Sequence, residues 1–213
     1  MWRRARWALL AGVGVLAVAC GSAPPPVFHP EGANPAASAP SRLAPSSQQV
    51  TWPPFGSNVR VIMPAWLPAD ASEVPAVITA KNFLLTYLYA EYRGNQDSRW
   101  TSYVAASVAS ALRSDLAKPD VTTESFTGTI RFSRMSAFAD PVLPGAVDVS
   151  ECFSNAQSAN VSLSSGQVIP DTTPAGQHYY RNTDALARDA SGRWRVVTIY
   201  PVIYYPQARE CKP

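Results

Sequence analysis

Residues 70–94 read DASEVPAVITAKNFLLTYLYAEYRG and carry the strongest helical pattern in the chain. Asp70 and Glu73 have the spacing of a capping box, and Pro75 suits the first helical turn. Apolar side chains then recur at helical spacing, and Gly94 follows as a typical C-terminal stop. The stretch therefore predicts a helix of roughly 19 residues.

Two shorter helices are expected next, at 97–103 and 104–116, with Pro119 ending the second. After about residue 120 the apolar pattern changes from helical spacing to alternation, which indicates strands. The expected strands are 126–138, 146–153, 160–163, 178–188, 193–200 and 202–205. Helices followed by antiparallel strands predict an α+β fold.

This order of elements resembles the NTF2-like fold. The resemblance covers about residues 72–205. It is carried by the long helix Val77–Tyr92, the short helix Asp97–Tyr103 and the GRWRV strand at Gly192–Val196. The resemblance implies an NTF2-like cone, in which N-terminal helices pack in a curved antiparallel sheet and leave a pocket at the wide end.

The start of the chain has the layout of an export signal. Three arginines lie within the first six residues, and an apolar run of about 13 residues follows, too short for a spanning helix. The run ends in LAVACG at residues 16–21, which resembles the lipobox of bacterial lipoproteins. The resemblance implies that Cys20 carries a lipid and that the protein is anchored on the extracytoplasmic face of the cell membrane. Residues 17–19 also suit ordinary signal peptidase, so free secretion is the alternative.

The three cysteines, Cys20, Cys152 and Cys211, agree with this interpretation. An unpaired thiol is a liability outside the cell. If Cys20 carries lipid, Cys152 and Cys211 remain to form a disulfide. Closing a loop of about 60 residues stabilises a fold by roughly 4 kcal/mol. Two separate buried thiols are the alternative. The placement of Cys152 and Cys211 around the expected strand at 193–200 also resembles small exported lipoproteins of high-GC Gram-positive bacteria.

Composition divides the chain into three parts. Residues 1–19 are expected to be a signal peptide, and residues 20–56 a lipidated, Pro/Ala/Ser-rich spacer. Such a spacer buries little apolar surface and stays extended. Residues 57–213 remain as a single α+β domain, because their length suits one domain better than two.

The mature chain is nearly neutral. The sequence has 18 basic and 15 acidic residues, and removing the three arginines of the signal leaves 15 of each sign. Nucleic-acid binding needs a basic patch or stripe, and no basic run follows residue 6. We therefore expect no nucleic-acid partner.

No motif predicts a metal, a cofactor or a catalytic nucleophile. His29 lies in the spacer, and His178 has no neighbours at ligand spacing, so it is expected on the surface or in a pocket wall. The chain has no Cys-x-x-Cys, no Gly-x-Ser-x-Gly and no glycine-rich phosphate loop in its folded part.

Carboxylates are the one enzymatic alternative. Some NTF2-like enzymes place an acidic side chain in an apolar cone, where burial raises its pKa. Asp148 and Glu151 precede Cys152 on one strand, and their odd spacing places them on opposite faces. Asp140 and Asp184 are further candidates. A solvated sheet edge is the simpler interpretation of each, so no residue is assigned a catalytic role.

Tyr87, Trp100 and Tyr103 are the candidate pocket-lining residues. They lie near the predicted helices and could bind an apolar or sugar-like ligand at the open end of a cone. Aromatic residues at helical spacing more often form the core, and that alternative stays open.

These patterns together favour a membrane-tethered, non-enzymatic binding module for a protein partner or a small apolar ligand. An accessory part of a conjugation or secretion assembly is one alternative, since the NTF2-like domains of conjugation machinery are a weaker likeness. A cone-pocket enzyme with a buried carboxylate is the other.

Overall fold

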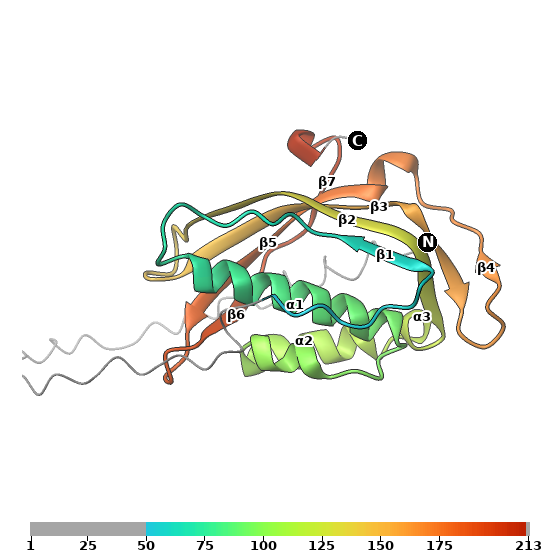
Figure 1. Ribbon diagram of the computed structural model, residues 1–213, viewed down its shortest axis with the longest axis horizontal. Helices are drawn as coiled ribbons and strands as arrows, with labels where there is room; N and C mark the ends of the chain where they lie inside the picture. The colour runs from blue at the N-terminus through green and yellow to red at the C-terminus, as the bar shows by residue number, and fades with distance from the viewer. Residues whose placement is uncertain (1–49, 212–213) are drawn as a thin grey trace, which may run out of the picture.

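The computed structural model describes residues 50–211 of the chain. Seven strands form one open, curved sheet, and helices α1 (Val74–Tyr92) and α2 (Ala106–Leu116) lie against one face of it (Figure 1). The predicted α+β class is confirmed. The predicted signal peptide, Cys20 and the spacer up to residue 49 lie outside the described residues. Within the described part, no helix has the length and apolar character needed to cross a membrane.

Helix α1 has the predicted 19 residues, but its N-terminus differs from the prediction. The N-cap residue is Glu73, which makes no side-chain cap, and Asp70 instead forms a local turn with Ser72. The predicted capping box is therefore wrong. At the other end, Gly94 has φ +61°, and the N–H groups of Gly94 and Asn95 donate to helix carbonyls at 3.1 and 2.8 Å. This is the glycine stop that the sequence predicts.

Every residue of α1 from Ala76 to Glu91 is buried, as expected for a helix that is covered on most of its circumference. The chain before the sheet contributes to that cover. The ring of Phe55 packs edge-on against Tyr89, with centroids 5.2 Å apart, and the N–H of Thr51 donates to Asn82 at 2.7 Å. The packed chain thus begins before residue 57, the predicted start of the domain.

Two short helical segments flank α2. The 3-10 turn η3 (Arg99–Tyr103) occupies the position of the predicted short helix. Helix α2 ends before Pro119, as expected, and Pro119 itself begins the four-residue helix α3 (Pro119–Thr122). Proline is tolerated there because the first N–H groups of a helix have no partner within it.

The sheet is larger than the sequence pattern indicates. Its strands are β1 (Val59–Ile62), β2 (Glu124–Ala139), β3 (Val147–Ser162), β4 (Val168–Ile169), β5 (Tyr179–Arg188), β6 (Trp194–Ile199) and β7 (Ile203–Tyr204). The main order is β1-β2-β3-β5-β6, with β4 paired to β3 and β7 paired to β5. Strand β1 pairs in parallel with β2 and was not predicted. The predicted strands 146–153 and 160–163 are two parts of the single strand β3.

The C-terminal segment lies on the face of the sheet opposite to α1 and α2 (Figure 1). We call this the outer face, and the face that contacts the helices the inner face. The predicted disulfide is present: Cys152 of β3 is bonded to Cys211 of the 3-10 turn η5 (Arg209–Cys211). Ala208 packs with the two cysteines, and all three are buried. The disulfide therefore attaches the end of the chain to the middle of the sheet.

Candidate functional site

Alternation along β3 divides its polar residues between the two faces. Val149 and Phe153 belong to the hydrophobic core beside the helices, so Glu151 between them lies on the inner face. Asp148 and Cys152 have the opposite phase and lie on the outer face. The prediction that Asp148 and Glu151 occupy opposite faces of one strand is confirmed.

Three polar side chains meet on the inner face, and we call Glu151, Asn182 and Asp184 the inner cluster. Nδ2 of Asn182 donates to Oε1 of Glu151 at 3.0 Å and, more weakly, to Oδ1 of Asp184 at 3.5 Å. Among residues 50–211, Oε2 of Glu151, Oδ1 of Asn182 and Oδ2 of Asp184 are buried and have no hydrogen-bond partner. The three residues are only 1, 3 and 0 % exposed. Buried polar atoms without partners are costly, and they concentrate here on neighbouring residues of one sheet.

Burial favours the neutral form of both inner carboxyls. Desolvation raises the pKa of Glu151 well above its usual value, and the charge of Asp184 raises it further, against a hydrogen bond from Asn182. Desolvation likewise raises the pKa of Asp184, with Asn182 opposing the rise and Asp148 adding to it. The pair could hold and transfer a proton, but only for a reactant that reaches it.

A second pair of acids, Asp140 and Asp148, lies near the start of β3. Burial raises the pKa of Asp140, but hydrogen bonds from Leu143, Val142 and Tyr200 outweigh it, so the net pKa is lowered. Those bonds measure 2.8, 2.6 and 2.9 Å. Burial, and then the hydrogen bond to Asp140 and its charge, raise the pKa of Asp148 to about 6. Asp140 is thus the ionised acceptor, and Asp148 is the member that holds a proton at mildly acidic pH.

In the part of the chain that the structure describes, the outer face has two hollows that Cys152 borders. The larger, of about 300 Å³, lies over β2, β3 and β5 and is called the outer hollow. Its lining includes Arg134, Ser136, Phe138, Ser150, Arg181, Thr183 and Glu210. The smaller, of about 210 Å³, is bordered by residues that include Thr129, Arg131, Ser133, Ser154, Gln157 and Tyr179. Both linings are rich in hydroxyl and guanidinium groups, which molecules from solvent can contact directly.

A β-bulge shapes the outer hollow. The pairing of β2 with β3 shifts between Ser133 and Ser136, so that Arg134 and Met135 together oppose Glu151. Met135 turns into the core, whereas Arg134 lines the hollow with φ +48°. This left-handed conformation costs a residue with a side chain about 1–2 kcal/mol.

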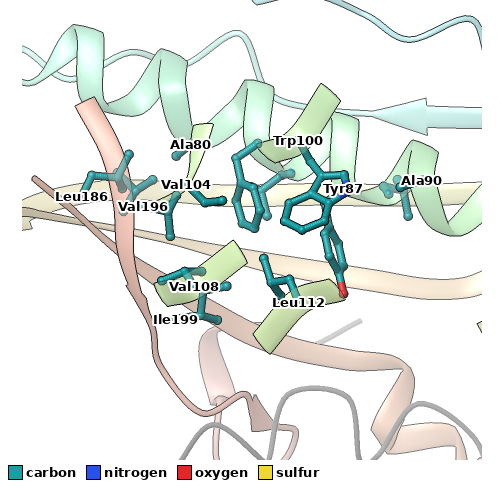
Figure 2. Packing of buried hydrophobic residues seen from close by; sticks show 14 of the residues in the cluster. Ala80, Tyr87, Ala90, Trp100, Val104, Val108, Leu112, Leu186, Val196 and Ile199 are labelled. Atoms are coloured by element: carbon teal, nitrogen blue, oxygen red, sulfur yellow. The ribbon is translucent and has the colours of Figure 1, made fainter. Parts of the chain in front are cut away.

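The three aromatic residues predicted to line a pocket lie in or against the hydrophobic core. Tyr87 and Trp100 are 5 and 2 % exposed, and their rings meet edge to face with centroids 5.8 Å apart. Figure 2 shows them beside Leu112 of α2. Tyr103 is partly buried against the same core. Neither hollow of the outer face borders them, and a ligand-binding role for these residues stays a prediction.

The lone histidine of the folded part, His178, lies between two polar neighbours. Its Nδ1 is 3.1 Å from Oδ1 of Asn155, and its Nε2 is 3.4 Å from Oδ2 of Asp171. Across residues 50–211, no group of three or more His, Cys, Asp or Glu side chains is arranged to hold a metal ion.

Sequence reasoning missed Asn182, Arg134 and Arg181. A signal for Asn182 exists, because it alternates with Asp184 and Leu186 and therefore shares their face. The sequence gives no signal for Arg134, because a β-bulge cannot be recognised from the alternation of apolar and polar residues. Arg181 becomes notable only once Glu210 is brought against it from the end of the chain.

No protein-family model matches this chain, and no curated protein matches it. Among solved structures, a similar chain is a protein described as a “putative ketosteroid isomerase” from Shewanella frigidimarina NCIMB 400. The sequence identity is 13 % and the TM-score is 0.30, over 57 % of this chain and 93 % of that chain. A likeness this weak carries no argument about function.

Proposed function

We propose that this protein is a lipid-tethered, extracytoplasmic binding module whose single NTF2-like domain acts without catalysis. The lipobox-like sequence before Cys20 and the pairing of the other two cysteines support the tether. The long buried helix α1 against an open, curved sheet supports an NTF2-like arrangement. The Pro/Ala/Ser-rich spacer would hold the domain away from the membrane surface.

One observation carries the proposal: solvent reaches the polar groups of the outer face but not those of the inner face. The free oxygens of the inner cluster are sealed from solvent. The outer hollow is open and offers arginine, serine and threonine side chains. A dissolved molecule can contact those groups without a change in the fold. Because the lining is polar, we propose a polar ligand in place of the small apolar ligand that the sequence suggests.

The tether is tested by mass spectrometry of the protein from native membranes. A lipid-modified N-terminal Cys20 is expected, and a Cys20→Ala variant should leave the membrane fraction. Native material with an unacylated Cys20 would contradict the tether and favour free secretion.

The binding surface is tested by filling the outer hollow. A screen of small polar compounds by thermal shift should find a ligand whose effect is lost in Ser136→Trp. The matched control is Ser114→Trp, at an exposed position on α2, which should retain the shift. A shift that survives Ser136→Trp but is lost in Asp184→Asn would place binding at the inner cluster and overturn the outer site.

A cone-pocket enzyme is the second candidate function, and the inner cluster is the observation that favours it. Buried carboxyls with raised pKa values are typical of general acids and bases. This function requires the inner face to open to reactants. A water-soluble carbodiimide, which modifies protonated carboxyls, should label Glu210 but leave Glu151 and Asp184 unmodified in a binding module. Labelling of the inner pair in the folded protein would favour the enzyme.

A further inference from the structure

We propose that the outer hollow binds a small ligand through an oxyanion group, either a phosphate or a carboxylate. This inference rests on the outer-face binding proposed above and names the chemical class of the ligand. The guanidinium groups of Arg134 and Arg181 line the same hollow. A guanidinium presents paired N–H donors that match two oxygens of a phosphate or carboxylate. A hollow of about 300 Å³ suits a molecule of small-metabolite size.

Hydroxyl groups add further donors to the hollow. The side chains of Ser136, Ser150 and Thr183 border it beside the two arginines. Thr183 donates to Oγ of Ser150 at 3.0 Å, and Ser150 in turn donates to the carbonyl of Asn182 at 3.2 Å. Serine and threonine hydroxyls can rotate toward an incoming acceptor. The linked hydroxyls of Thr183 and Ser150 can therefore turn a donor toward a bound oxyanion.

The positive charge in the hollow is only partly neutralised. Arg134 forms no ion pair with any residue of the described chain. Arg181 donates from Nη1 to Oε1 of Glu210 at 2.8 Å, and these side chains are 39 and 41 % exposed. Exposed ion pairs are weak, so a ligand can displace Glu210 or use the other N–H groups of Arg181. Glu151 also borders the hollow, but it has the inner-face phase, and its Oε1 accepts a hydrogen bond from Asn182 on that face.

Arg134, which has no ion pair with a described residue, also has a strained backbone. In a regular strand the residue after Ser133 would turn toward the inner face. The bulge inserts Arg134 as an extra residue, so that it lines the outer hollow while Ser136 keeps its place there. The cost is a left-handed backbone at a residue that is not glycine. Strain of this kind concentrates at sites where the position of a side chain matters for binding.

The test is calorimetric titration of the full chain with its disulfide intact. Three probes are used separately: inorganic phosphate, sulfate and succinate. The buffer is kept near an ionic strength of about 0.01 M, where charge interactions are least screened. Arg134→Gln should weaken binding about ten- to hundredfold, as expected for losing charge-assisted hydrogen bonds. Arg113→Gln is the matched control, because Arg113 is exposed on α2, and it should leave affinity unchanged.

The outcomes separate the ligand class from the binding surface. Binding of phosphate or sulfate without succinate identifies a tetrahedral oxyanion, and binding of succinate alone identifies a carboxylate; both support the proposal. Equal weakening by Arg134→Gln and Arg113→Gln would overturn it, because the effect would be one of net charge. Absence of heat with all three probes would also overturn it. In that case, loss of a neutral ligand's thermal shift in Ser136→Trp would still support the outer hollow as a binding surface.

Discussion

The inner and outer faces of the β3–β5 pair carry opposite chemistry on adjacent residues. Glu151 and Asn182 point toward the helices, where they are sealed and leave oxygens without partners. Ser150 and Arg181, one position away on the same strands, border an open hollow. One face therefore holds polar groups that cost stability, and the other holds polar groups that a ligand can reach.

The difference shows how the two-residue period of a strand separates two possible functions within one pair of adjacent strands. Substitutions at consecutive positions act on different faces, so each face can be altered without touching the other. The disulfide, the two pairs of acids and the bulge can thus be tested individually. The expected effect on stability is largest for the disulfide, smaller for the acids and smallest for the bulge.

The largest effect is expected from removal of the disulfide that holds the C-terminal segment on the outer face. Cys152 and Cys211 are 59 residues apart, and a loop of that length restricts the unfolded chain by about 4 kcal/mol. The double variant Cys152→Ala/Cys211→Ala should lose about that much free energy of unfolding in urea at pH 7. Reductant should lower the wild-type value similarly and leave the double variant unchanged. A loss below about 1 kcal/mol would show that packing alone holds the segment.

The second effect concerns Asp148, whose pKa of about 6 compares with a usual value of 3.8. Between these values the unfolded chain releases a proton that the folded protein keeps, so stability falls as the pH rises from about 4 to 6. The deficit above pH 6 is on the order of 3 kcal/mol.

Asp148→Asn should remove most of that deficit, because its amide can still donate to Asp140. Urea unfolding at pH 4 and at pH 7.5 should show the variant equal to wild type at the lower pH and more stable at the higher. A variant that is less stable at pH 7.5 would mean that the ionised carboxylate has a stabilising partner.

Local pattern was enough to predict part of this fold. Helix α1 follows from apolar spacing and from Gly94, and β6 from a run of β-branched and aromatic residues. Strand β1 was missed because its four residues pair with a strand about 70 residues later, which no local pattern reports. The middle of β3 was missed because residues 154–159 read SNAQSA. That segment is extended because β2 pairs with it, despite weak strand propensity.

The candidate site likewise has one part that the sequence predicts and one part that it does not. Cysteine parity predicted the disulfide, and strand alternation predicted that Asp148 and Glu151 lie on opposite faces. The outer hollow depends on a bulge and on where the C-terminal segment lies. Both are consequences of register and tertiary contact, so Arg134 and Glu210 could not be brought together from the sequence alone.

The third effect tests the cost of the inner cluster. Burial raises the pKa of Glu151, so its contribution to stability is lost as the pH rises above about 4.5. Glu151→Gln keeps an acceptor for Asn182 and stays neutral at every pH. It should therefore be more stable than wild type at pH 8, where the unfolded wild-type chain gains from ionising Glu151 and burial opposes that ionisation in the folded protein. The gain should be about 2 kcal/mol, the order of the desolvation penalty of a buried polar group. At pH 4 the variant should match wild type.

The outer-face neighbour provides the control for that experiment. Ser150→Ala changes the adjacent residue without adding or removing a titratable group. Its effect on unfolding free energy should be the same at pH 4 and pH 8. If Glu151→Gln also gives a pH-independent change, the inner carboxyl does not titrate differently in the folded and unfolded chains, and the contrast between the faces loses its electrostatic basis.

The smallest effect isolates the strain at the bulge. Arg134 has φ +48°, a conformation that glycine adopts freely and that costs a residue with a Cβ atom about 1–2 kcal/mol. Arg134→Gly should therefore be more stable than Arg134→Ala by about 1 kcal/mol in urea unfolding. At Arg113, within the regular helix α2, the order should reverse, because glycine is the poorer helix former by about 1 kcal/mol. If alanine matches glycine at position 134, the bulge stores no strain. The conformation of Arg134 would then follow from sheet geometry alone, and only its unpaired charge would remain to argue for a ligand.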